Sequence, residues 1–168
     1  MKKTNIILIG MPNSGKSTIG EVLAKILKKE FIDIDSVIIG KAQKQPREIV
    51  HEEGLEKFLQ LQESIILELD LHGCVVATGG SVIYGKTSME RLRGIGAIVY
   101  LKYTYEEIEQ RFTSCRKLAR NRHQSLKDLY LERIKLYEKY ADIIIECTGK
   151  SVDEIVADVN ICLEEYIS

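Results

Sequence analysis

A glycine-framed loop near the start of the chain has the residue types that bind phosphate. It runs from Gly10 to Thr18 with the sequence GMPNSGKST. An apolar run at 5–9 precedes it and an amphipathic run follows, which predicts the order strand, glycine loop, helix. Glycines permit backbone conformations that side chains forbid, so amide N–H groups between Gly10 and Gly15 can turn around an anion. The helix behind the loop adds its positive end.

Two side chains in this loop complete a nucleoside triphosphate site. Lys16 can reach the outer phosphates as a point charge, and the Ser17 hydroxyl can ligate the Mg²⁺ that accompanies a triphosphate. An accidental match within a glycine turn is the alternative, but the flanking strand and helix favour phosphate binding. The residues assigned to nucleotide binding are Gly10, Pro12, Asn13, Ser14, Gly15, Lys16, Ser17 and Thr18.

A pair of carboxylates follows the first helix. The segment Phe31-Ile-Asp-Ile-Asp35 alternates apolar and acidic residues, which predicts a strand with both aspartates on one side. With a phosphate loop upstream, Asp33 is a candidate Mg²⁺ ligand through water. Asp35 can hold or deprotonate the hydroxyl that receives the phosphoryl group. The alternative is that Asp35 only caps a helix that begins at Ser36.

Two further segments have features of a ligand site. The turn Thr78-Gly-Gly-Ser81 follows an apolar strand at 74–77, and its glycines leave the backbone bare enough to approach a ligand. An ordinary tight turn is the alternative. The cationic segment 113–123 lacks hydrophobic periodicity and is predicted to be a lid that brings cations to the transferring phosphoryl group. The alternative is a solvated surface loop.

The elements that position these segments alternate along the chain. Apolar strands are predicted at 5–9, 31–35, 74–77, 97–101 and 143–145, with helices between them. This pattern predicts an α/β fold with a five-stranded parallel sheet covered on both faces. Ligands in such folds bind at the carboxyl ends of strands, so the three loops can meet in one crevice. Capping pairs predict helix starts at Thr104, Ser125 and Ser151, and Pro46 and Gly54 interrupt the helical pattern of 41–70.

The composition limits the classes of function. With 168 residues and 45% apolar content, the chain is expected to form one domain, 1–168. Lys and Arg number 24 against 25 Asp and Glu, and a net charge of −1 argues against nucleic acid or an anionic membrane as a partner. The four cysteines form no Cys-x-x-Cys pair, so no zinc site or disulfide framework is suggested. The start leads directly into a short strand, so we expect a cytoplasmic protein, a monomer that acts on a small molecule.

The order of these motifs resembles that of the shikimate kinase family over nearly the full chain. The residues that carry the resemblance are the loop Gly10 to Thr18, the segment 31–35, Gly54 followed by Phe58 and Glu63, Ala77-Thr-Gly-Gly80, Arg116 with Leu118, and Arg133-x-x-x-Tyr137-x-x-Tyr140-Ala141-Asp142.

The resemblance implies a P-loop kinase fold of the nucleoside-monophosphate-kinase type, with a short lid at about 113–123 and an acceptor-binding helical segment at about 35–63. It further implies ATP with Mg²⁺, and transfer of the γ-phosphoryl group to a hydroxyl of shikimate, giving shikimate 3-phosphate in aromatic amino acid biosynthesis. Lys16 and Arg116 would stabilise phosphate charge, and Asp33 would serve Mg²⁺. The implied acceptor-binding residues are Asp35, which would activate the hydroxyl, Gly79, Gly80, Ser81, and Arg133, which would contact the carboxylate.

The chain departs from the family pattern at three positions. Leu59 stands where the family has an arginine that grips the substrate carboxylate, Ser81 replaces a third glycine, and Lys117 replaces a proline. A hydrogen bond to a charged group contributes about 1.5–3 kcal/mol, so losing the arginine should weaken carboxylate binding roughly tenfold to over a hundredfold.

Several interpretations accommodate these departures. In the first, another cation, namely Arg47, Arg91 or Arg93, compensates for Leu59. In the second, the kinase acts on a different hydroxyl compound. The third is a nucleotide-binding regulatory protein without kinase activity.

Overall fold

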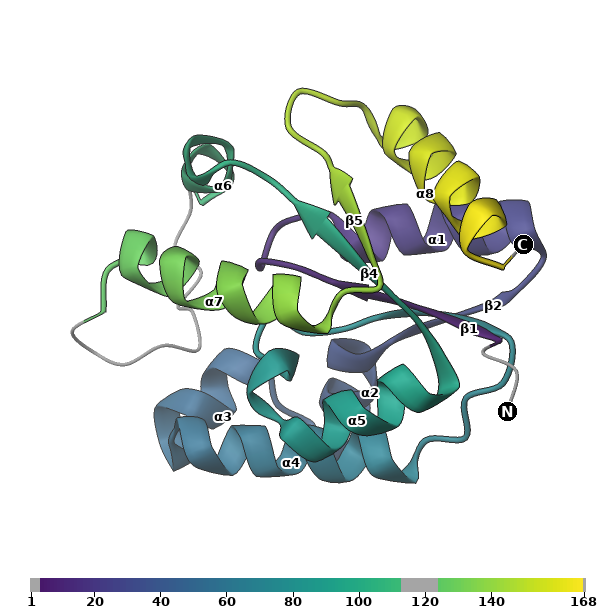
Figure 1. Cartoon of the computed structure of the whole chain (residues 1–168). Helices are drawn as coiled ribbons and strands as arrows, with labels where there is room; N and C mark the ends of the chain where they lie inside the picture. Colours follow the sequence, from purple (N-terminus) through teal and green to yellow (C-terminus); the bar gives the residue numbers. More distant parts are fainter. Residues whose placement is uncertain (1–3, 113–123, 168) are drawn as a thin grey trace.

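The computed structural model describes residues 4–112 and 124–167, and its centre is a parallel β-sheet (Figure 1). The strands are β1 (Asn5–Ile9), β2 (Glu30–Asp33), β3 (Cys74–Ala77), β4 (Gly96–Lys102) and β5 (Ile143–Glu146). Their order across the sheet is β2-β3-β1-β4-β5, so the strand that leads into the glycine loop is central. Ile7 of β1 is paired with Val76 on one side and with Ile98 on the other.

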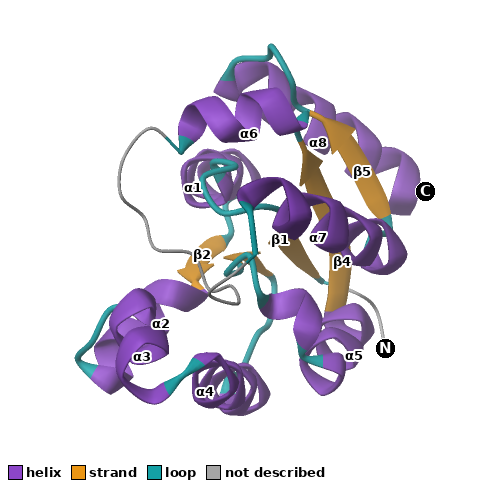
Figure 2. Cartoon of the chain, turned by 90° about the vertical axis from the view of Figure 1, so that its left-hand side faces the viewer, coloured by secondary structure: helices purple, strands orange, loops and turns teal. Residues whose placement is uncertain are grey.

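Helices cover both faces of the sheet (Figures 1 and 2). Helices α1 and α8 pack together on one face, and α5 and α7 contact β4 on the other. Helices α2, α3 and α4 form a group beside α5. The bounds are α1 (Lys16–Leu27), α2 (Ile34–Ala42), α3 (Pro46–Glu53), α4 (Leu55–Glu68), η1, a 3₁₀ turn (Val82–Tyr84), α5 (Lys86–Ile95), α6 (Tyr105–Arg111), α7 (Leu126–Tyr140) and α8 (Val152–Ile167). The predicted α/β fold with a five-stranded parallel sheet is confirmed.

The inner strands are apolar because both of their faces are covered. All residues of β1 and β3 are buried, whereas edge strand β5 alternates buried and exposed residues. Asn5 is the polar member of β1, and both polar atoms of its side chain form hydrogen bonds. Its Nδ2 donates to the carbonyls of Leu71 and Ile95 at 2.9 and 3.0 Å, and its Oδ1 accepts the Cys74 N–H at 2.9 Å. Asn5 therefore ties together the end of the sheet opposite the glycine loop.

The predicted helix boundaries are confirmed where capping residues mark them. Ser125 and Asp128 form a reciprocal capping box at the start of α7, and the Thr104 side chain accepts the Glu107 N–H at the start of α6. Pro46 is the first residue of α3, and Gly54 separates α3 from α4. Proline is tolerated at a first helical position because its missing N–H would have no intrahelical partner there.

The predicted strand at 31–35 is wrong at its C-terminal end. Strand β2 ends at Asp33, and Ile34 already begins α2. Asp33 is the N-cap residue of this helix, because its Oδ1 accepts the Ser36 N–H at 3.1 Å. That bond stops the strand, since it satisfies a backbone donor of the first helical turn. Asp35 therefore lies in the first turn of α2 and does not cap it.

The predicted lid at 113–123, with Arg116 and Lys117, lies outside the described residues. Within the parts that are described, no helix is long and apolar enough to cross a bilayer.

Candidate active site

A cleft of about 930 Å³ lies where the predicted loops end at the carboxyl edge of the sheet. It brings together the glycine loop, both aspartates, the 78–81 turn and Arg133 of α7. Ser14 belongs to the loop but is fully buried beneath it. The lining residues that the sequence singled out are Pro12, Asn13, Gly15, Lys16, Ser17, Thr18, Asp33, Asp35, Gly79, Gly80, Ser81 and Arg133.

The glycine loop wraps around the amino group of Lys16. Gly15 immediately precedes α1 with φ of 80°, a left-handed conformation that glycine adopts without a steric penalty. Lys16 Nζ donates to the carbonyls of Gly10 and Met11 at 2.9 and 2.8 Å. Burial lowers the pKa of Lys16 to about 8, although the neighbouring Asp35 carboxylate opposes this shift. The loop thus holds a desolvated amine at the place where a phosphate would supply negative charge.

Ser17 and Asp33 place two oxygen ligands side by side at the start of α1. The Ser17 hydroxyl donates a short hydrogen bond to Asp33 Oδ2. The other carboxylate oxygen of Asp33 caps α2, so its position is fixed by both elements. Hydroxyl and carboxylate oxygens suit a hard cation such as Mg²⁺, which keeps most of its ligands as water and phosphate oxygens.

The turn at 78–81 is held close to the glycine loop. Thr78 Oγ1 donates to the Leu8 carbonyl at 2.9 Å, and the Tyr137 hydroxyl donates to the Gly80 carbonyl at 2.5 Å. Burial raises the pKa of Tyr137 to about 12, so this hydroxyl keeps its proton. A Cβ atom on Gly80 would lie 2.6 Å from Pro12 Cδ. Glycine is required at this position because the two loops touch.

Arg133 is a buried cation that lies beside the 78–81 turn. It comes from the middle of α7, its side chain is 1% exposed, and it lines the cleft. Its Nε donates to the Tyr84 hydroxyl at 3.4 Å, and Nη1 lies 3.0 Å from the position of a Cβ on Gly80. A buried guanidinium beside a glycine turn can form paired hydrogen bonds with a carboxylate.

Sequence reasoning missed Gln62 of α4, which is 3% exposed. Ser81 Oγ donates to Gln62 Oε1 at 3.4 Å, whereas Nε2 has no hydrogen-bond partner within the described parts of the chain. Nε2 and Asp35 Oδ1 each lie 2.9 Å from the position of a Cβ on Gly79. The available signal was its spacing, because Gln62 interrupts the apolar stripe of α4 that includes Phe58 and Ile65.

Sequence reasoning also missed Arg111, at the end of α6. Its Nη1 donates to the Asn13 carbonyl at 3.2 Å, and its guanidinium lies 4.3 Å from the centroid of the Tyr103 ring. Arg111 lines the cleft beside the glycine loop. Its position gave no signal, because a basic residue in the last turn of a helix is common for reasons of helix electrostatics alone.

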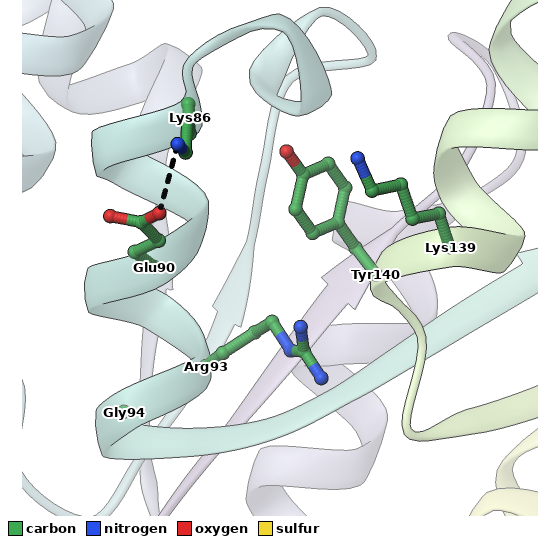
Figure 3. A pocket seen from close by; sticks show the side chains of 6 residues that line it. All are labelled: Lys86, Glu90, Arg93, Gly94, Lys139 and Tyr140. Atoms are coloured by element: carbon green, nitrogen blue, oxygen red, sulfur yellow. Dashed lines mark ion pairs between the residues drawn. The ribbon is translucent and has the colours of Figure 1, made fainter.

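The three arginines considered as replacements for the one missing at Leu59 lie in different places. Arg47 lines the cleft. Arg91 donates to the carbonyls of Ile66 and Leu69, near and just beyond the end of α4, at 3.1 and 2.6 Å. Arg93 lines a separate pocket between α5 and α7 with Tyr140 (Figure 3). The hypotheses for Arg91 and Arg93 are therefore wrong.

Comparisons with known proteins agree with this geometry. The sequence profile of the family described as shikimate kinase matches residues 12–164. A shikimate kinase of Francisella tularensis subsp. novicida is 37% identical, covering 98% of this chain and 97% of that protein. A shikimate kinase of Clostridium botulinum is 35% identical, with coverage of 94% and 95%. The solved structure of an Acinetobacter baumannii shikimate kinase in complex with shikimate has a TM-score of 0.86 and 30% identity, covering 97% of this chain and 94% of that one.

Proposed function

The chain belongs to the shikimate kinase family, and from this membership we propose that it transfers the γ-phosphoryl group of ATP to a hydroxyl of shikimate. The observation that carries the proposal is the contact between the glycine loop and the 78–81 turn through Pro12 and Gly80. The glycine loop and the 78–81 turn therefore line one cleft, which supports direct transfer between two bound molecules.

The phosphate half of the cleft binds ATP in this proposal. The backbone N–H groups of the loop and the start of α1 surround the outer phosphates. Lys16 exchanges its bonds to the carbonyls of Gly10 and Met11 for bonds to phosphate oxygens, which carry more negative charge. Arg111 adds a second cation at this end, beside Asn13.

Ser17 and Asp33 hold Mg²⁺ in this proposal, Ser17 directly and Asp33 through water. Their adjacent oxygens fit a cation that prefers oxygen ligands. When bound, Mg²⁺ neutralises charge that develops on the phosphate oxygens. The Ser17–Asp33 hydrogen bond holds both side chains where such a cation would meet them.

The acceptor half orients the hydroxyl that receives the phosphoryl group. Asp35 lies in the first turn of α2 and lines the cleft, where its carboxylate accepts the hydroxyl proton. Arg133 binds the substrate carboxylate, and Gly79 and Gly80 let the substrate approach the backbone. The Ser81 hydroxyl is directed to Gln62, so this departure from the family pattern anchors a neighbouring side chain.

The phosphate-stabilising role of Arg116 concerns a residue outside the described ranges and stays a prediction. A regulatory protein without catalysis is not favoured, because Lys16, Ser17 and Asp33 lie together as phosphate transfer requires. The cytoplasmic location and the monomeric state stay predictions as well.

A direct assay tests the function. The chain is incubated with Mg²⁺, ATP and shikimate, beside a panel of hydroxy acids, polyols and sugars, and ADP release and phosphorylated product are measured. We expect shikimate to be the best acceptor. Asp35→Asn should reduce turnover at least a hundredfold while ATP still binds, because the amide cannot accept the proton. Asp153→Asn, on the exposed first turn of α8, is the matched control. Better turnover of another acceptor, or no turnover, would refute the proposal.

A further inference from the structure

Arg47 is the second residue of α3 and lines the cleft with Asp35, Ser81 and Arg133. It is exposed, and within the described parts of the chain it has no ion-pair partner. An arginine that faces a ligand cleft without a carboxylate partner can bind an anion there.

The acidic residues near Arg47 are already occupied by other groups. Glu48 Oε2 accepts the N–H of Gln45 at 2.7 Å in the capping box of α3. Glu52 and Glu53 pair with Lys44 at 2.5 and 3.9 Å. The local sequence therefore provides partners for these carboxylates and leaves the guanidinium of Arg47 for the cleft.

The surroundings of Arg47 define the kind of ligand. Pro46, Val50 and Phe58 line the same cleft as Arg47 and offer apolar surface to a ligand. Leu59, beside Phe58, packs against the core and contributes no charge. Among the described residues of the cleft, Lys16 and Arg111 lie at the glycine loop. For the carboxylate of an acceptor with an apolar ring, Arg133 supplies one buried guanidinium, and Arg47 offers a second.

We propose that Arg47 is the second carboxylate-binding residue of the acceptor site. It takes the place of the family's arginine, where this chain has Leu59. The inference rests on the proposed function, because it assigns the carboxylate of shikimate to Arg47 and Arg133 together. The guanidinium that donates to the substrate carboxylate then comes from the first turn of α3, and not from α4, where Leu59 lies. Because Arg47 is exposed, its contribution is screened by salt, unlike that of Arg133.

The experiment compares Arg47→Ala and Arg47→Lys with Arg93→Ala, whose side chain lines the separate pocket of Figure 3. The KM for shikimate, the KM for ATP and kcat are measured at low and high salt. Arg47→Ala should raise the KM for shikimate roughly tenfold at low salt and less at high salt, with the KM for ATP unchanged. Arg47→Lys should raise the KM for shikimate less than Arg47→Ala does. Arg93→Ala should behave as the unmodified chain does.

A shikimate analogue with a neutral carboxamide identifies the group that Arg47 contacts. The unmodified chain should bind this analogue more weakly than shikimate, and Arg47→Ala should weaken its binding no further. An unchanged KM for shikimate in Arg47→Ala overturns the proposal. An equal loss for shikimate and the carboxamide also overturns it, because Arg47 would then act by shaping the cleft.

Failure of the proposed function gives a different result. If the unmodified chain binds shikimate but does not phosphorylate it, the function fails, and calorimetric dissociation constants of the same variants decide the role of Arg47. If the chain neither binds nor phosphorylates shikimate, both proposals fail.

Discussion

Gln62 has two polar ends in different surroundings. Its Oε1 accepts the Ser81 hydroxyl, whereas Nε2 points toward Gly79 near Asp35 Oδ1. The reverse amide orientation would direct a carbonyl oxygen at the Asp35 carboxylate, so the donor end belongs on the Asp35 side. A buried donor without a partner costs about 1–3 kcal/mol. We therefore expect a hydroxyl oxygen of the bound acceptor to accept from Gln62.

Replacing Gln62 by methionine tests this role. Gln62→Met keeps the length of the side chain and removes the donor, and it should raise the KM for shikimate by about three- to tenfold. The KM for ATP should not change. Gln60→Met, on the exposed side of α4, is the matched control. An unchanged KM for shikimate would show that the amide serves packing alone.

Lys16 predicts a pH dependence of ATP binding. Its pKa of about 8 means that the amine is about 90% charged at pH 7 and about 10% charged at pH 9. Only the charged form attracts phosphate strongly, so ATP affinity should fall roughly tenfold over this range. Between pH 8 and the ordinary lysine pKa of 10.5, the unfolded chain binds more protons, so this residue makes folding stability rise with pH.

Calorimetry at pH 7, 8 and 9 measures the ATP dissociation constant and the proton uptake on binding. Lys16→Met should bind ATP weakly and with little dependence on pH. An ATP affinity that stays constant from pH 7 to 9 in the unmodified chain would contradict the assignment of Lys16 as the amine that binds phosphate.

At the scale of elements, the packing of α1 against β2 depends on Gly20. A Cβ atom there would lie 2.5 Å from Phe31 Cε2 and 3.3 Å from Leu8 Cδ1. Gly20→Ala should lower the free energy of unfolding by about 1–3 kcal/mol, because the overlap outweighs the better helix propensity of alanine. Gly40→Ala is the matched control, since Gly40 lies in α2 with nothing within 4 Å, and it should stabilise by about 0.5–1 kcal/mol.

Urea denaturation of the two variants gives these values. Equal effects of the two substitutions would mean that Phe31 moves away at little cost and that the α1–β2 contact is loosely packed.

The elements also show which features could be predicted from sequence. Strands β1 and β3 were predicted residue by residue, because inner strands of a covered parallel sheet are short and apolar throughout. The end of β2 was not predicted, because the alternating pattern continues to Asp35 while the cap formed by Asp33 ends the strand. Periodicity does not report which aspartate will bond to the backbone.

The candidate site was predictable where its residues come directly after the carboxyl end of a strand. The glycine loop, Asp35 and the 78–81 turn all lie in the cleft as the strand order requires. Gln62 and Arg47 were harder to place, because each comes from a helix whose rotation against the sheet is set by packing. Helical periodicity places Gln62 on the buried side of α4 but does not say that this side meets Gly79.

At the scale of the whole molecule, ligand binding should raise the free energy of unfolding with the logarithm of the ligand concentration. Mg²⁺-ATP at a hundred times its dissociation constant adds about 2.7 kcal/mol. For a chain of 168 residues this corresponds to a rise in Tm of roughly 5–10 °C. Thermal unfolding monitored by circular dichroism measures it. Lys16→Met should lose most of the shift, and a full shift in that variant would mean that ATP binds elsewhere.

The predicted monomer is tested by light scattering during gel filtration. We expect a mass near 19.1 kDa, with and without substrates. A mass near twice this value would show that copies of the chain associate, and the exposed Ile26 and Ile161 would then be the first residues to substitute.

The contact between Pro12 and Gly80 has a consequence for how such a chain can evolve. Because Gly80 has no side chain and meets the rigid ring of Pro12, the loop proposed to bind ATP and the turn proposed to receive the substrate keep their spacing when other side chains of the cleft change. Acceptor preference is instead proposed to depend on side chains of α3 and α4, such as Arg47 and Gln62. A mutant library confined to 45–62 should therefore yield variants with new acceptors that still use ATP, whereas mutations at Gly80 should abolish activity with every acceptor.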